Sequence, residues 1–93
     1  MPAIRLLRVP ADVRALVRGL HPEIKRKVRA GLDELIRNPE AGKPLRDDLD
    51  GLRSLRVSRL RIIYWINSPR LIDIVTIGPR RTVYEDTAKR LRK

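Results

Sequence analysis

The stretch LRSLRVSRLRIIYW, residues 52–65, decides the fold that we expect for this chain. Apolar residues alternate with arginine or serine along it, which indicates two successive strands, 52–58 and 60–67. Because successive side chains of a strand point to opposite faces, one face can enter a core while the other carries arginines. The segment from Arg53 to Arg81 holds seven arginines and one acid, Asp73. The stretch therefore predicts a sheet with a cationic face, which suits a polyanion.

The rest of the chain switches between strand and helix periodicity. Residues 3–9 read as a short first strand that ends at Pro10, and residues 71–78 as a last strand covered on both faces. Apolar residues three and four apart predict a helix over 10–20 and a second one from Pro22 to Asn38. Two antiparallel helices joined by a turn are the expected result. The tail from Thr82 to Lys93 is helical in pattern.

The element order β-α-α-β-β-β predicts one α+β domain over residues 1–93. Its helical hairpin is expected on one face of an antiparallel-rich sheet. Residues 39–51 are expected to be a loop, with two prolines and two glycines. This loop carries the acidic cluster of the chain, Glu40, Asp47, Asp48 and Asp50, which we interpret as a solvated loop that offsets the local positive field.

Composition narrows the classes of function. The formal net charge is +11, with 22 Lys and Arg against 11 Asp and Glu, and such an excess attracts anionic partners. With no cysteine and one histidine, His21, the chain offers no thiolate or histidine-based metal centre, and we expect no metal and no cofactor. No apolar run approaches the ~20 residues that cross a bilayer. A cytoplasmic protein without a membrane partner is the default expectation.

Four side chains are the candidates for a functional site. Period-2 alternation places Arg56 and Arg61 on the sheet face that the helices leave open, and Arg80 follows the last strand. Tyr84, beyond the same strand, is the candidate for stacking on a base. Taken singly, each arginine is also explained as a solvated side chain. Taken together, they fit either nucleic-acid phosphates or an acidic protein segment. Trp65 is expected to fill the core or a partner groove.

The chain lacks the usual patterns of metal or histidine catalysis. It has no Ser/His/Asp order, no paired carboxylates within a motif and no glycine-rich phosphate loop. Metal-free cleavage of RNA stays open, because RNA supplies its own nucleophile, the 2′-hydroxyl. A protein that catalyses this reaction orients the hydroxyl, neutralises the pentavalent phosphate and assists the proton transfers. Arginines supply the second of these functions, but they are poor proton carriers.

Three phrases resemble one family: KPLRDDLDGL at 43–52, LRVSRLRIIY at 55–64 and IGPRRTVY at 77–84. With the element order, they resemble the RelE/ParE superfamily of type II toxin–antitoxin toxins over nearly the whole chain. The closing phrase is more similar to the RelE branch, whose members cleave mRNA in the ribosomal A site. The resemblance implies a metal-independent endoribonuclease that inhibits translation. Its expected partners are mRNA, the ribosome and a cognate antitoxin in a hetero-oligomer, with operator DNA contacted through that complex.

The resemblance also implies roles for individual residues. Arg61 would stabilise the transition-state phosphate, Arg80 would act near the leaving oxygen, and Tyr84 would stack on or orient the target nucleotide. Arg56 would lie close to the attacking 2′-hydroxyl. Three further arginines of the segment are expected to bind RNA: Arg53, Arg59 and Arg81. Some family members carry lysines on the strand of Arg56, near Ser54, and a glycine where this chain has Ser58.

Two other functions share the same fold and stay open at this point. ParE-like toxins poison DNA gyrase, and they usually lack the arginine-rich ending with its tyrosine. A module without catalytic activity would instead hold an acidic antitoxin and contact nucleic acid. Growth arrest with cut messages, growth arrest with trapped DNA breaks, and unchanged growth distinguish the three functions.

Overall fold

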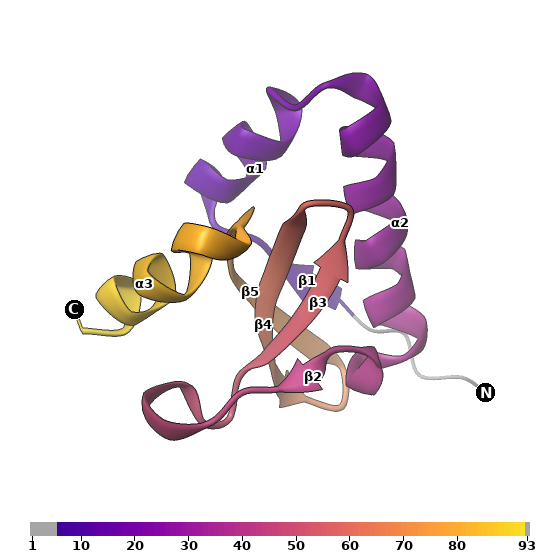
Figure 1. The fold of residues 1–93 in the computed structure, drawn as a ribbon. Helices are drawn as coiled ribbons and strands as arrows, with labels where there is room; N and C mark the ends of the chain where they lie inside the picture. The colour runs from indigo at the N-terminus through magenta and orange to yellow at the C-terminus, as the bar shows by residue number, and fades with distance from the viewer. Residues whose placement is uncertain (1–5, 93) are drawn as a thin grey trace.

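The computed structural model describes residues 6–92, in which three α-helices surround one five-stranded sheet (Figure 1). The spatial strand order is β1-β5-β4-β3-β2; β1 runs parallel to β5 and every other neighbouring pair is antiparallel. The elements follow along the chain as β1 (Leu6–Arg8), α1 (Ala11–Arg18), α2 (Pro22–Arg37), the 3₁₀ helix η1 (Pro39–Ala41), β2 (Lys43–Pro44), the 3₁₀ helix η2 (Asp47–Leu49), β3 (Arg53–Val57), β4 (Leu60–Ser68), β5 (Leu71–Pro79) and α3 (Arg80–Leu91).

The α+β class, the helical hairpin and the three long strands are confirmed. The helix α2 begins at Pro22, where the His21 ring accepts a hydrogen bond from the Glu23 backbone N–H (3.2 Å). The expected first strand is observed over Leu6–Arg8, and its residues 3–5 lie outside the described part of the chain. The expectation of a loop over 39–51 was wrong in part, because the segment contains the short elements η1, β2 and η2. Its short elements depend on contacts with the sheet that periodicity does not reveal.

The larger core lies between the helical hairpin and one face of the sheet. Ile62 and Tyr64 of β4 point into it and are fully buried, together with Val28 and Leu35 of α2. Helix α2 comes so close to β3 that a Cβ added at Gly31 would lie 2.7 Å from the Val57 Cγ2 atom. Glycine at this position is therefore what allows α2 to rest on the sheet.

Helix α3 covers part of the opposite face and forms a second, smaller core (Figure 1). Val83 of α3 packs with Ile63 of β4 and Leu52, and Val75 of β5 borders them. A register shift between β4 and β5 lets Val75 join this side, since Tyr64 pairs with Ile74 and Ile63 with Thr76. The expectation that the helices leave this face open was therefore wrong in part, because Ile63 and Val75 need an apolar cover.

The corner of this face formed by the β3–β4 hairpin lies outside the second core. The hairpin closes through Ser58 and Arg59, and Val57 pairs with Leu60. Ser58 adopts a φ of 57°, a left-handed conformation that costs a non-glycine residue about 1–2 kcal/mol. The hairpin turn is thus a strained position, at the place where the resemblance expects glycine.

We predict that Ser58→Gly raises the free energy of unfolding by about 1 kcal/mol, because glycine adopts positive φ without a Cβ clash. Urea denaturation of the two proteins measures the difference. The matched control is Arg59→Gly, the neighbouring turn residue, whose φ is not positive and which we expect to gain nothing. If Ser58→Gly were no more stable than the wild type, the conclusion that Ser58 is strained would be contradicted.

The edge strand β1 is tied to β5 by an ion pair. The Asp73 carboxylate accepts hydrogen bonds from the Arg8 guanidinium (2.5 and 3.2 Å) and from the Asn67 amide (2.7 Å). The hydrogen bond with Arg8, and then the one with Asn67, lower the pKa of Asp73 although partial burial opposes the shift. The ionised carboxylate is thus part of what holds a three-residue strand to the sheet.

We predict that this contribution disappears in acid. A carboxyl whose pKa is lower in the folded protein stabilises it above the unfolded pKa, near 4, and loses that effect as pH falls through the folded pKa. The stability advantage of the wild type over Asp73→Asn should therefore be full at pH 6 and shrink progressively below about pH 4. Thermal unfolding from pH 6 to pH 2 measures it. A difference that stays constant with pH would contradict the prediction.

Candidate functional site

The uncovered corner of the sheet forms a small pocket surrounded by arginines. It has a volume of about 190 Å³, and we call it the arginine pocket; it is lined by Arg56, Ser58, Arg59, Leu60, Arg61 and Arg80. The structure thus brings together four of the seven arginines singled out from the sequence. They come from β3, the hairpin turn, β4 and the start of α3.

Arg56 and Arg61 are direct cross-strand partners. Side chains directly opposite one another on neighbouring strands lie on the same face and interact, and like charges there destabilise the sheet. None of the residues that line the arginine pocket carries a carboxylate. Within residues 6–92, none of its four arginines takes part in an ion pair. The pocket therefore carries uncompensated positive charge that an anion would relieve.

The start of α3 adds to this positive charge. The helix begins at Arg80 directly after Pro79, and its first turn contains Arg80 and Arg81 but no acid. Cations at a helix N-terminus are unfavourable, because the backbone N–H groups there already carry partial positive charge. The expected helical tail starts two residues earlier than the sequence pattern indicates, so Arg80 is held by a helix rather than by a free loop.

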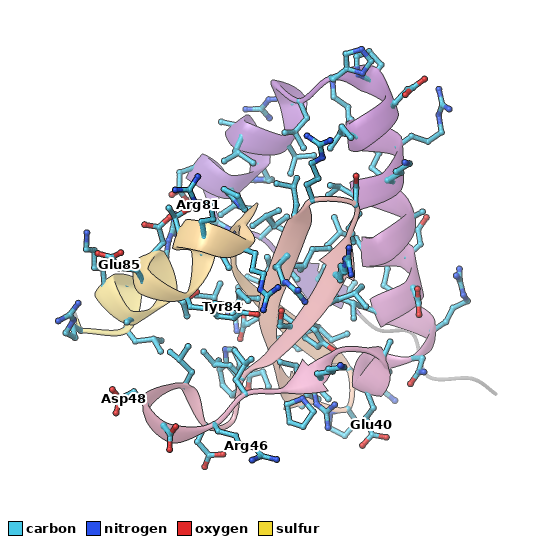
Figure 2. All side chains as sticks on the ribbon, in the orientation of Figure 1. Glu40, Arg46, Asp48, Arg81, Tyr84 and Glu85 are labelled. Carbon is cyan, nitrogen blue, oxygen red and sulfur yellow. The ribbon has the colours of Figure 1, made fainter. Side chains whose placement is uncertain are left out.

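Tyr84 lies on the side of α3 that faces the sheet (Figure 2). Its hydroxyl is 3.4 Å from the Ser54 Oγ atom, and either group can be the donor. Ser54 belongs to the same face of β3 as Arg56, two residues away. Tyr84 is half-buried and lies beside the arginines on this face, although it does not line the arginine pocket itself.

The remaining predicted residues have other surroundings. Arg53 lies on the opposite side of β3 and donates hydrogen bonds to the carbonyl oxygens of Gly42 (2.7 Å) and Glu40 (3.3 Å). Arg81 is exposed on the outer side of α3, as is Glu85 (Figure 2). RNA binding by Arg53 and Arg81 stays a prediction. Trp65 is 39% exposed, so it does not fill the core, and the alternative that it fills a partner groove stays a prediction.

No acid of the 39–51 segment lines the arginine pocket. Figure 2 shows Asp48 and Arg46 in the loop, well separated from Arg81. Glu40 is 4.0 Å from Arg53, and within the described chain it is the one loop acid in an ion pair. No cluster of three acidic or histidine side chains suited to a metal ion occurs in residues 6–92. No helix among them is long and apolar enough to span a bilayer.

A buried tyrosine holds the segment next to the site. The hydroxyl of Tyr64, a fully buried side chain, donates to the Pro39 carbonyl oxygen (2.6 Å) and accepts from the Gly42 N–H (2.9 Å). Burial raises the pKa of this phenol, so it stays protonated and keeps both hydrogen bonds. We call residues 39–44 the strap. It places Lys43 opposite Ser54, a position that sequence reasoning did not select.

Residues 8–84 match the family model described as the ParE toxin of type II toxin-antitoxin system, parDE. The chain belongs to this toxin family. Membership in the RelE/ParE superfamily, which the three phrases indicated, is thereby confirmed. A comparison with curated proteins gives no significant match.

Solved structures share the fold of this toxin. A chain of the RelBE2 toxin–antitoxin complex from Mycobacterium tuberculosis is 29% identical, with 86% of this chain and 100% of that chain covered and a TM-score of 0.70. A free double arginine-to-alanine mutant of Escherichia coli RelE is 20% identical, with 98% and 99% covered and a TM-score of 0.72. YafQ from E. coli is 19% identical, with 86% and 98% covered and a TM-score of 0.66.

We predict that Arg61→Gln stabilises the free toxin, because it removes one member of the like-charged pair with Arg56. The gain in unfolding free energy should be about 0.2–1 kcal/mol at low salt. It should shrink at 1 M NaCl, where the screening length falls to about 3 Å. Urea denaturation at both salt concentrations measures it.

The control for this comparison is Arg70→Gln, an exposed arginine in the β4–β5 turn. It removes the same charge away from the pocket, so it reports the effect of net charge alone. A loss of stability in Arg61→Gln at low salt would mean that Arg61 supports the fold instead of opposing it.

Proposed function

We propose that this toxin inhibits translation by cleaving mRNA in the ribosomal A site, without a metal ion. The observation that carries the proposal is the arginine pocket, which gathers four arginines and no carboxylate beside Tyr84. RNA brings its own nucleophile, so the protein needs mainly to orient the 2′-hydroxyl and stabilise the pentavalent phosphate. Several forked guanidinium groups around one small cavity suit that charge.

The roles that we propose are those that the family resemblance implies, and the shared face of these side chains supports them. Arg61 stabilises the transition-state phosphate together with its cross-strand partner Arg56, which acts closer to the attacking 2′-hydroxyl. Arg80 approaches from α3 and acts near the leaving 5′-oxygen. Tyr84 orients the target nucleotide on the neighbouring part of the face, next to Ser54. Arg59, in the hairpin turn, contributes to binding the RNA backbone.

The partners follow from the same proposal. One relative of similar fold is recorded in a complex with its RelB antitoxin, and we propose that a cognate antitoxin likewise binds this toxin and contacts operator DNA with it. Acidic residues of that antitoxin would be attracted to a chain of net charge +11, so association should slow as salt rises. Since the proposed substrate is mRNA on the translating ribosome, we place the toxin in the cytoplasm.

A second candidate is a gyrase poison, and a specific observation favours it. The matching family model is that of ParE toxins, whereas the arginine pocket and Tyr84 favour the RNase. A gyrase poison leaves messages intact and produces DNA breaks joined to protein. A third alternative, a binding module without catalytic activity, leaves growth unchanged and forms only the antitoxin complex.

The test is to induce the toxin alone and map the 5′ ends of cellular RNA. We expect cuts confined to translated regions, with 5′-hydroxyl ends, because attack by the 2′-hydroxyl leaves the phosphate on the upstream fragment. A message without a start codon should stay intact. Arg61→Ala with Arg80→Ala should lower cleavage by at least 10²-fold, the usual effect of removing one group that stabilises the transition state.

The control is Arg26→Ala with Arg70→Ala, which removes the same charge from two exposed positions outside the pocket. It should cleave like the wild type. Full toxicity of the Arg61 and Arg80 double variant would overturn the site. Cuts with 5′-phosphate ends would overturn the 2′-hydroxyl mechanism, and trapped DNA breaks with intact messages would favour the gyrase poison.

A further inference from the structure

Strand β2 brings a lysine onto the face that carries the site. Lys43 pairs with Ser54 in the antiparallel ladder between β2 and β3. Residues directly opposite in such a ladder share a face, and so do residues two apart along one strand. Lys43 therefore lies on the same face as Ser54 and Arg56, and Arg56 lies opposite Arg61.

A second pocket adjoins the arginine pocket on this face. It has a volume of about 280 Å³, and we call it the lysine pocket; it is lined by Ala41, Lys43, Ser54, Leu55, Arg56 and Arg61. Arg56 and Arg61 line both pockets. A phosphate held between these two arginines would thus have Arg80 on one side and Lys43 on the other. In the described chain Lys43 is exposed and forms no ion pair.

The backbone next to Lys43 is held on both sides. The buried Tyr64 hydroxyl binds the Gly42 N–H (2.9 Å), while Arg53 donates to the Gly42 carbonyl oxygen (2.7 Å). A Cβ added at Gly42 would lie 2.7 Å from that hydroxyl, so the approach requires glycine. Lys43 is therefore presented from a fixed backbone position, although its strand has only two residues.

Lys43 has a chemical property that its neighbours lack. The other lining groups of the two pockets are guanidinium, hydroxyl and aliphatic side chains. Guanidinium stays protonated in proteins, whereas a lysine amine can accept a proton. Resting on the proposed function, we propose that Lys43 accepts the proton of the attacking 2′-hydroxyl. This assigns the proton transfer to a residue of the strap and not to the strand of Arg56.

The reaction starts with Lys43 as the uncharged amine. The O–H bond of the 2′-hydroxyl breaks and its proton joins the Nζ atom of Lys43, while the 2′-oxygen forms a bond to phosphorus. The bond from phosphorus to the 5′-oxygen breaks, and that oxygen takes a proton from water. The products are a 2′,3′-cyclic phosphate and a 5′-hydroxyl, with Lys43 left as an ammonium that returns its proton to solvent.

The experiment compares Lys43→Arg and Lys43→Ala with the wild type in single-turnover cleavage on mRNA-programmed ribosomes. Arginine keeps the positive charge but cannot accept the proton, so both variants should be slower by about 10²-fold or more. Binding is measured on ribosomes whose mRNA carries a 2′-deoxy nucleotide at the cleavage position. The dissociation constant of Lys43→Arg should differ from that of the wild type by less than threefold. The wild-type rate should rise with pH, and the Lys43→Arg rate should lose that rise.

The matched control is Lys27→Arg, an exposed lysine on α2 outside both pockets, which should cleave like the wild type. If Lys43→Arg cleaved at the wild-type rate, Lys43 would only bind the phosphate, and the proposal would be overturned. A wild-type cleavage rate of Lys43→Ala would overturn it as well. In either case a cleaving wild type leaves the proposed function standing. A wild type that cuts no ribosome-bound message would overturn the proposed function, and the role of Lys43 with it.

Discussion

The structure depends on one constraint: strand β4 has to bury both of its faces. Ile62 and Tyr64 point to one side and Ile63 to the other, and all three are fully buried. The helical hairpin covers the first side, and α3 with the 45–52 segment covers the second. Since α3 packs on β4 and β5, it leaves the β3–β4 corner of the second face uncovered. Arg56 and Arg61 occupy that corner.

The arginines of this corner repel one another, and the surrounding packing holds them in position. The local potential is positive because four arginines and the N-terminus of α3 meet here, two of the arginines being direct cross-strand partners. No carboxylate lines the pocket to offset this charge. The two cores and the strap hold these groups in place in the absence of a ligand. A site that is arranged before binding does not need to reorganise when charge develops on a phosphate, which is the main way that such electrostatic stabilisation accelerates a reaction.

The parts of the structure that sequence predicted are those that periodicity controls. Alternation along β3 and β4 placed Arg56 and Arg61 on one face, where the structure makes them direct partners. The apolar run of β5 correctly indicated a strand covered on both faces. What periodicity missed depends on long-range contacts. Helix α3 buries only Val83 and Thr87, too few residues for its docking to be visible in the sequence. Strand β2 has two residues and exists because Tyr64 and Arg53 hold its neighbours, so Lys43 was not selected.

The central claim is that the arginine pocket holds the phosphate of a ribosome-bound message. The most direct measurement is a structure of the toxin on a ribosome whose mRNA carries a 2′-deoxy nucleotide at the cleavage position. We expect the phosphate between Arg61 and Arg56, with Arg80 towards the 5′-oxygen and Tyr84 against the nucleotide. A phosphate bound elsewhere on the toxin, with the pocket facing solvent, would contradict the account.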